Sequence, residues 1–101
     1  MNNINLQEEI KTLTGQPVML DQDTTLTYKN ALLLACESYN PQPKQPGDML
    51  KAYRLGMKIL EVKEELKLDD DEIKTLLKIV DTASYPAVVI GRLTDFINTK
   101  N

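Results

Sequence analysis

The stretch Leu68-Asp69-Asp70-Asp71-Glu72-Ile73 specifies the start of a helix more strongly than any other part of the chain. Asp69 is expected to cap this helix, and Glu72 follows three residues later in the spacing of a capping box. Leu68 and Ile73 stand at the two positions of a hydrophobic staple, and the acidic run favours the positive end of the helix dipole. Apolar residues then recur with helical spacing at Ile73, Leu76, Leu77 and Val80.

Three more segments have the same kind of periodicity, so that the sequence predicts helices over residues 26–39, 48–67, 69–83 and 86–98. Thr25 or Thr27 can cap the first helix, because a hydroxyl accepts the free amide hydrogens of the first turn. Asp48 can cap the second, and Pro86 suits the first position of the fourth. We expect one aliphatic core that contains Leu32, Leu33, Cys36, Tyr53, Ile59, Leu60, Ile73, Leu77, Val80, Val89, Leu93 and Phe96.

The N-terminal part, residues 4–23, has a different pattern. Thr14-Gly15-Gln16-Pro17 is typical of a turn, and it predicts a short strand pair that joins residues 8–13 to 17–20. A helix over 6–13 is the competing interpretation. The expected fold class is therefore α+β and mainly α, with a short N-terminal β-turn or hairpin segment followed by a compact four-helix domain.

The 101 residues allow a single domain, 1–101, with its helical core over 24–98 and a frayed tail at 99–101. Hydrophobic residues make up 42% of the chain and charged residues 27%, as in an ordinary globular protein. The proline-rich stretch Asn40–Gly47 is expected to link the first two helices. Gly56 lies inside the second predicted helix, where a close approach by another helix would explain it.

The chain lacks the residues that most catalytic chemistry needs. It has no histidine and a single cysteine, Cys36, which follows Leu33-Leu34-Ala35 and is therefore interpreted as a small core residue. The acidic residues Asp21, Asp23 and 69–71 could hold a hard cation, but no calcium-loop pattern surrounds them. We expect no catalytic residue, no cofactor and no metal ion, and hence a protein that is not an enzyme.

Charge argues against an extended nucleic-acid interface. The net charge is −3, and the chain has only two arginines among its cations. Lys51, Arg54 and Lys58 form one basic strip on the second predicted helix, and together with Arg92 they are the candidate contacts to a partner. A small nucleic-acid-binding regulator that uses these four residues is the alternative function.

The leading expectation is a non-enzymatic protein–protein interaction module. The apolar helix faces are wide for so small a domain, which predicts a homo-oligomer or a contact with another protein. No stretch of the sequence reaches the length and apolarity of a membrane span, and no signal peptide is recognisable. With one thiol, a cytoplasmic location is expected.

In order along the chain, the sequence resembles a loose group of small uncharacterised proteins of tailed phages and prophages. The matching segments are Thr14-Gly15-Gln16-Pro17, Thr25-Leu26-Thr27, Ala31-Leu32-Leu33, Tyr53-Arg54-Leu55-Gly56-Met57-Lys58-Ile59, Glu72-Ile73-Lys74 and Pro86-Ala87-Val88-Val89-Ile90-Gly91. The resemblance implies a phage or prophage origin, an accessory or assembly role, and a partner that is the chain itself or a phage or host protein. If the chain is phage-encoded, its expected location is the host cytoplasm.

Overall fold

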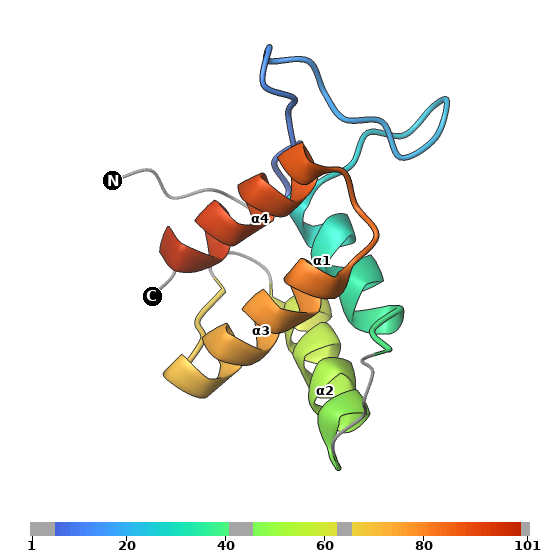
Figure 1. Ribbon diagram of the computed structural model, residues 1–101. Coiled ribbons are helices and arrows are strands. Elements are labelled where there is room, and N and C mark those ends of the chain that lie inside the picture. Colours follow the sequence, from blue (N-terminus) through green and yellow to red (C-terminus); the bar gives the residue numbers. More distant parts are fainter. Residues whose placement is uncertain (1–5, 41–45, 63–65, 100–101) are drawn as a thin grey trace.

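The computed structural model describes residues 6–40, 46–62 and 66–99. Within these residues the elements are α1 (Tyr28–Glu37), α2 (Asp48–Glu61), α3 (Asp70–Thr82) and α4 (Ala87–Thr99). Figure 1 shows α1 next to α2 and α3 next to α4, and α3 also packs against α2. The coarser prediction, a mainly α domain of four helices, is confirmed.

The core is aliphatic and lies where the four helices meet. Most of the predicted core is buried in the structure: Leu32, Cys36, Ile59, Ile73, Val80, Val89, Leu93 and Phe96. Leu33 and Leu77 are half-buried and pack against this core. The ring of Phe96 stacks on that of Tyr28, with 5.0 Å between the centroids, so α4 is held to the first residue of α1.

The prediction of a core position is wrong for two residues. Tyr53 is 63% exposed and Leu60 is 52% exposed. The reason is the rotation of α2, which presents Ala52, Leu55 and Ile59 to the core instead. Because α2 carries two neighbouring apolar stripes, burying one of them leaves the other at the surface.

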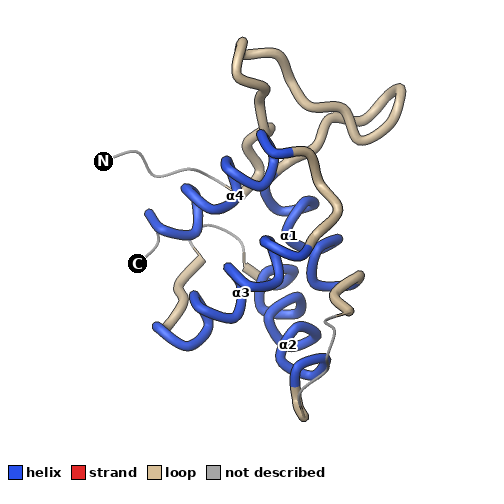
Figure 2. Tube along the Cα trace, viewed as in Figure 1, coloured by secondary structure: helices blue, strands red, loops and turns tan. Residues whose placement is uncertain are grey.

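The N-terminal segment does not form the expected strand pair, and it is not the competing helix either. Three backbone hydrogen bonds form a closed ring: Ile10 donates to Leu26, Leu26 donates to Val18, and Val18 donates back to Ile10, at 2.7–2.8 Å. Isolated antiparallel bridges join the three chain segments in pairs. Each segment makes a single bridge to each of its two neighbours, so no ladder forms and the described residues contain no β-strand (Figure 2).

This ring also closes the core. Ile10 is fully buried, Leu26 is 3% exposed, and Val18 packs against the core cluster. Gly15, with φ of 89°, allows the first turn, and the carboxylate of Asp21 accepts the amides of Asp23 and Thr24 in the second. The segment is therefore an irregular cap on the helices.

Several helix ends differ from the prediction by a few residues. Of the two predicted caps of α1, Thr27 is the one that the structure uses. Gly47, in a left-handed conformation, precedes α2, where the sequence predicts Asp48 as the cap. The second helix ends at Glu61 rather than 67. The fourth runs from 87 to 99 instead of 86–98, with Pro86 directly before it. Most of the predicted linker (41–45), residues 63–65 of the predicted second helix and the end of the tail (100–101) lie outside the described residues.

The start of α3 is as predicted. The Asp69 side chain accepts the amide of Glu72 at 2.8 Å, and the Glu72 carboxylate accepts the amide of Asp69 at 3.0 Å. The same oxygen of Glu72 accepts from Lys58 Nζ at 2.7 Å, which ties the end of α2 to the start of α3. One carboxylate therefore serves both the cap and the packing of two helices.

Replacing Asp69 by Ala should lower the free energy of unfolding by about 1 kcal/mol, because an amide at the start of α3 loses its acceptor. Urea denaturation measures this loss. Asp70→Ala is the matched control, since this carboxylate is exposed and belongs to no cap. Equal losses in the two variants would contradict the capping box.

Candidate functional site

Helix α2 has three different faces. Ala52, Leu55 and Ile59 are buried against the rest of the domain. Lys51, Arg54 and Lys58 follow a second face with the spacing that the sequence predicted. The third face is apolar and points to solvent, with Met49 46%, Leu50 53%, Tyr53 63%, Met57 37% and Leu60 52% exposed. We call these five residues the α2 strip.

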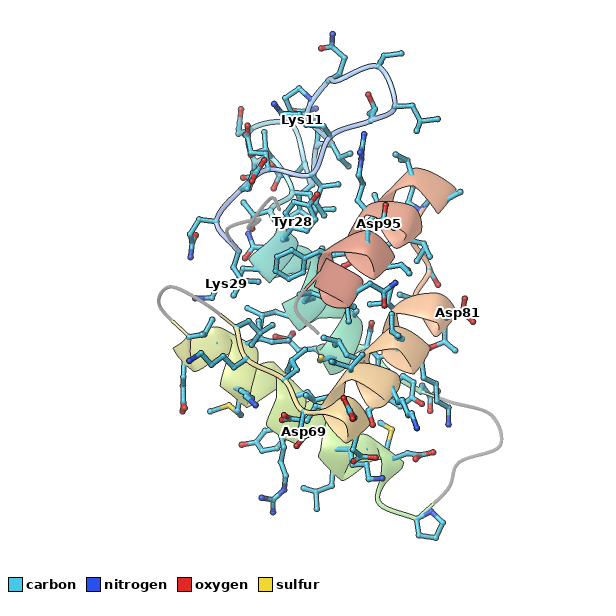
Figure 3. All side chains as sticks on the ribbon, turned by 90° about the vertical axis from the view of Figure 1, so that its left-hand side faces the viewer. Lys11, Tyr28, Lys29, Asp69, Asp81 and Asp95 are labelled. Atoms are coloured by element: carbon cyan, nitrogen blue, oxygen red, sulfur yellow. The ribbon has the colours of Figure 1, made fainter. Side chains whose placement is uncertain are left out.

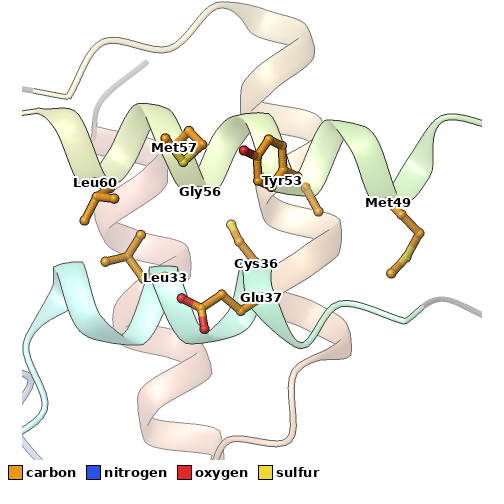
Figure 4. Close-up of a pocket in the computed structure, with 9 residues that line it drawn as sticks. Leu33, Cys36, Glu37, Met49, Tyr53, Gly56, Met57 and Leu60 are labelled. Carbon is orange, nitrogen blue, oxygen red and sulfur yellow. The ribbon is translucent and has the colours of Figure 1, made fainter.

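The α2 strip borders a groove between α2 and α1 (Figure 4). Leu33, Cys36 and Glu37 of α1 form one side of it, and Met49, Ala52, Tyr53, Gly56, Met57 and Leu60 of α2 form the floor and the other side. Its volume is about 380 Å³. Among the described residues that line it, Glu37 is the only carboxylate, so the groove suits apolar side chains.

The floor of the groove lies where α1 and α2 approach each other. A Cβ atom on Gly56 would lie 3.4 Å from Cys36 Cβ, which is about as near as two such atoms come without a shift. The expected close approach at Gly56 is therefore present. The glycine also leaves the groove open at this point, because no side chain rises from the floor.

Cys36 is a buried free thiol, as predicted. Burial raises the pKa of this thiol to about 11, and the neighbouring Glu37 carboxylate adds to the rise. The thiolate, not the thiol, is the nucleophile and the metal ligand, so Cys36 is unreactive at neutral pH. In the groove it acts as a small apolar side chain.

The structure divides the four predicted contact residues into two pairs. Lys51 and Arg54 are exposed on α2. Lys58 is bound to Glu72 of α3, and Arg92 is bound to the N-terminal segment. Two of the four cations therefore hold the domain together.

Arg92 joins the irregular cap to α4. Its Nε donates to the carbonyl of Lys11 and its Nη2 to the carbonyl of Thr12, each at 3.0 Å. Figure 3 shows the segment that carries Lys11 beside the helix that carries Asp95. A guanidinium presents several donors in a fixed plane, so one side chain can hold two successive carbonyls.

Among the residues that the structure describes, no three His, Cys, Asp or Glu side chains come close enough to hold a metal ion. The two acidic stretches that the sequence singled out lie in a turn and a helix cap. The Asp21 carboxylate accepts a hydrogen bond from a backbone amide of its own turn, and Asp69 caps α3. No helix in the described part of the chain is long and apolar enough to cross a membrane.

The sequence found part of this site. Tyr53 and Leu60 are apolar positions of the second predicted helix, but the sequence assigns both to the core rather than to a surface. Met49 was not singled out. The sequence feature that points to a binding surface is the presence of two apolar stripes on α2. A helix at the edge of a small domain buries only one such stripe.

Comparison with known proteins adds no relative: no family model, no curated protein and no solved structure matches the chain. What it binds must therefore be inferred from its own residues.

Arg92→Ala should loosen the irregular cap. We expect a loss of about 1–2 kcal/mol in unfolding free energy and faster amide hydrogen exchange in residues 10–20, since two carbonyls lose their donor. Lys74→Ala is the control, because Lys74 is exposed on α3; it should stay within about 0.5 kcal/mol of the parent. Unchanged exchange in Arg92→Ala would show that the guanidinium does not hold the segment.

The buried thiol predicts a loss of stability in base. The unfolded chain releases the Cys36 proton near the ordinary thiol pKa of 9.0, whereas the folded chain keeps it to about 11. Stability from this group is thus fully present below pH 9 and falls as pH rises towards 11, by about 2–3 kcal/mol in total. Burial also raises the pKa of Tyr28 and Tyr85, which adds to the fall.

Urea denaturation at pH 8, 9, 10 and 11 measures this slope. Cys36→Ala should have a shallower slope than the parent, with the tyrosine contribution remaining. Identical slopes in the two proteins would mean that the thiol ionises equally easily in the folded and unfolded chains.

Proposed function

We propose that this protein is a non-enzymatic protein–protein interaction module and that the α2 strip, with the groove beside it, is its binding surface. The observation that carries the proposal is the exposure of five large apolar side chains on one face of one helix. Scattered apolar residues are common on protein surfaces, but a contiguous set of this size is typical of an interaction site.

The exposed fractions of the strip together equal about two and a half fully exposed side chains. At about 200 Å² for each, this is roughly 500 Å² of apolar surface. Monomeric proteins rarely expose a larger patch, and patches of about 300–600 Å² are often functional. Burying it would supply roughly 12 kcal/mol at about 25 cal/mol per Å², before the costs of association are subtracted.

The shape of the surface suits a helical partner. A groove between two helices receives the apolar side of an amphipathic helix, whose anchors follow one another at helical spacing. Met49 and Met57 favour such binding because their flexible thioethers adapt to the side chains that they meet. The resemblance to small phage proteins supports a phage or prophage setting, with an accessory or assembly role.

The nucleic-acid alternative is weakened by the position of its residues. Lys58 and Arg92 make contacts inside the domain, so only Lys51 and Arg54 of the four are left to face a phosphate backbone. Together with a net charge of −3, two cations supply little of the counterion release on which such binding depends.

Photo-crosslinking in cells tests the interaction function. A photoreactive phenylalanine analogue at position 53 should give discrete protein adducts, because this side chain lies in the middle of the strip. The same analogue at position 74, an exposed site on α3, is the matched control and should give none. Absence of adducts at both positions would overturn the proposal, as would equal adducts at both.

A further inference from the structure

We propose that the occupant of the groove is a second copy of this chain, in a dimer whose two α2 helices run parallel and in which Arg54 faces Glu37 of the partner subunit. The inference rests on the proposed function and names the partner. By two-fold symmetry each α2 helix then lies in the groove of the other subunit. Four helices, α1 and α2 of each subunit, would pack together.

The area of the strip fits such a dimer. A stable interface of standard size buries about 800 Å² on each partner. About 65% of a homodimer interface is apolar, which is roughly 500 Å² for each subunit. The α2 strip exposes about this much surface, so a second copy would cover it without requiring another large apolar region.

Near the middle of the groove, the two rims of the apolar surface carry charges of opposite sign. On α2, Arg54 follows Leu50 by four residues and precedes Met57 by three, so it borders the strip. On α1, Glu37 follows Leu33 by four residues and lines the groove. Both Arg54 and Glu37 are exposed. If the α2 helix of a second copy lies in the groove, it meets the acidic residue Glu37 on one side. The basic residue Arg54 on that helix needs such an acidic neighbour.

The backbones of Arg54 and Glu37 also lie at nearly the same level along the groove, so their long side chains can meet across an interface. Figure 4 shows α1 and α2 running in opposite directions, with Leu33 toward the Leu60 end of α2 and the Glu37 side chain turned back toward Leu33. Cys36 meets Gly56, so Glu37 lies level with residue 55, one residue from Arg54. At about 1.5 Å of rise per residue, the two levels differ by little more than a bond length.

In a parallel two-fold dimer, equivalent residues of the two subunits lie at the same position along the groove, and the α2 rim of each subunit faces the α1 rim of the other. Arg54 of each subunit therefore meets Glu37 of the partner subunit. In an antiparallel dimer, the α2 rim of one subunit faces the α2 rim of the other instead. Because the strip is centred near residue 55, it would place Arg54 close to Arg54 of the partner subunit. Like charges in that position are unfavourable, and the parallel arrangement is therefore the one that the rims favour.

A charge exchange tests the arrangement, with the dimer dissociation constant of the full chain measured by sedimentation equilibrium. Arg54→Glu and Glu37→Arg should each raise this constant at least about tenfold, because each places like charges together. The double variant, which restores an opposite pair with exchanged signs, should return to within about threefold of the parent. Lys51→Glu is the control: it makes the same change of charge on α2 at a position away from the strip, and should leave dimerisation nearly unchanged.

Introduced thiols provide a second measurement of direction. In a parallel dimer identical residues face each other, so Met57→Cys and Tyr53→Cys should each form a covalent dimer alone on mild oxidation. In an antiparallel dimer a mixture of the two variants would be needed. The parent chain is the control, because its buried Cys36 should form no intermolecular disulfide.

The outcomes separate this inference from the interaction function. Failure of the double variant to recover, or disulfides that form only in the mixture, would overturn the parallel arrangement. A parent chain that stays monomeric at millimolar concentration, while position 53 still cross-links to another protein, would overturn the second copy and leave the interaction function standing. A monomer without any adduct would remove both.

Discussion

The seating of Ala52, Leu55 and Ile59 in the core determines what the rest of α2 presents. Once these three side chains are buried, the helical repeat leaves Met49, Tyr53, Met57 and their neighbours at the surface. The contact between Gly56 and Cys36 and the ion pair between Lys58 and Glu72 act on the same helix, and both restrain its rotation. The candidate binding surface is therefore a consequence of how α2 packs.

Features that depend on neighbouring residues were predictable. The capping box at Asp69 and Glu72 lies within four residues, and helical periodicity located all four helices. The N-terminal cap was not predictable in this way, because its ring joins Ile10, Val18 and Leu26, which are separated by eight residues each. A turn signal predicts that the chain reverses, but it does not tell that a third segment will compete for the same backbone groups.

The sequence predicted only that some apolar helix surface would be left exposed, not where the candidate site lies. The sequence carries more apolar helix surface than a small core can take, and this led to the expectation of self-association. Which stripe of α2 faces outward depends on distant contacts, since both stripes have the same period. The same limit applies to the cations: Arg92 binds Lys11 and Thr12, about 80 residues away, and no local pattern reveals this partner.

Hydroxyl-radical footprinting with mass spectrometry, at low and high protein concentration, measures the two faces of α2 in one sample. In dilute protein, Met49, Tyr53 and Met57 should be oxidised while Leu55 and Ile59 stay protected. In concentrated protein, protection should spread to the first three residues and leave the surface of α3 unchanged. Oxidation of Leu55 and Ile59 in the folded chain would contradict the packing of α2 described above.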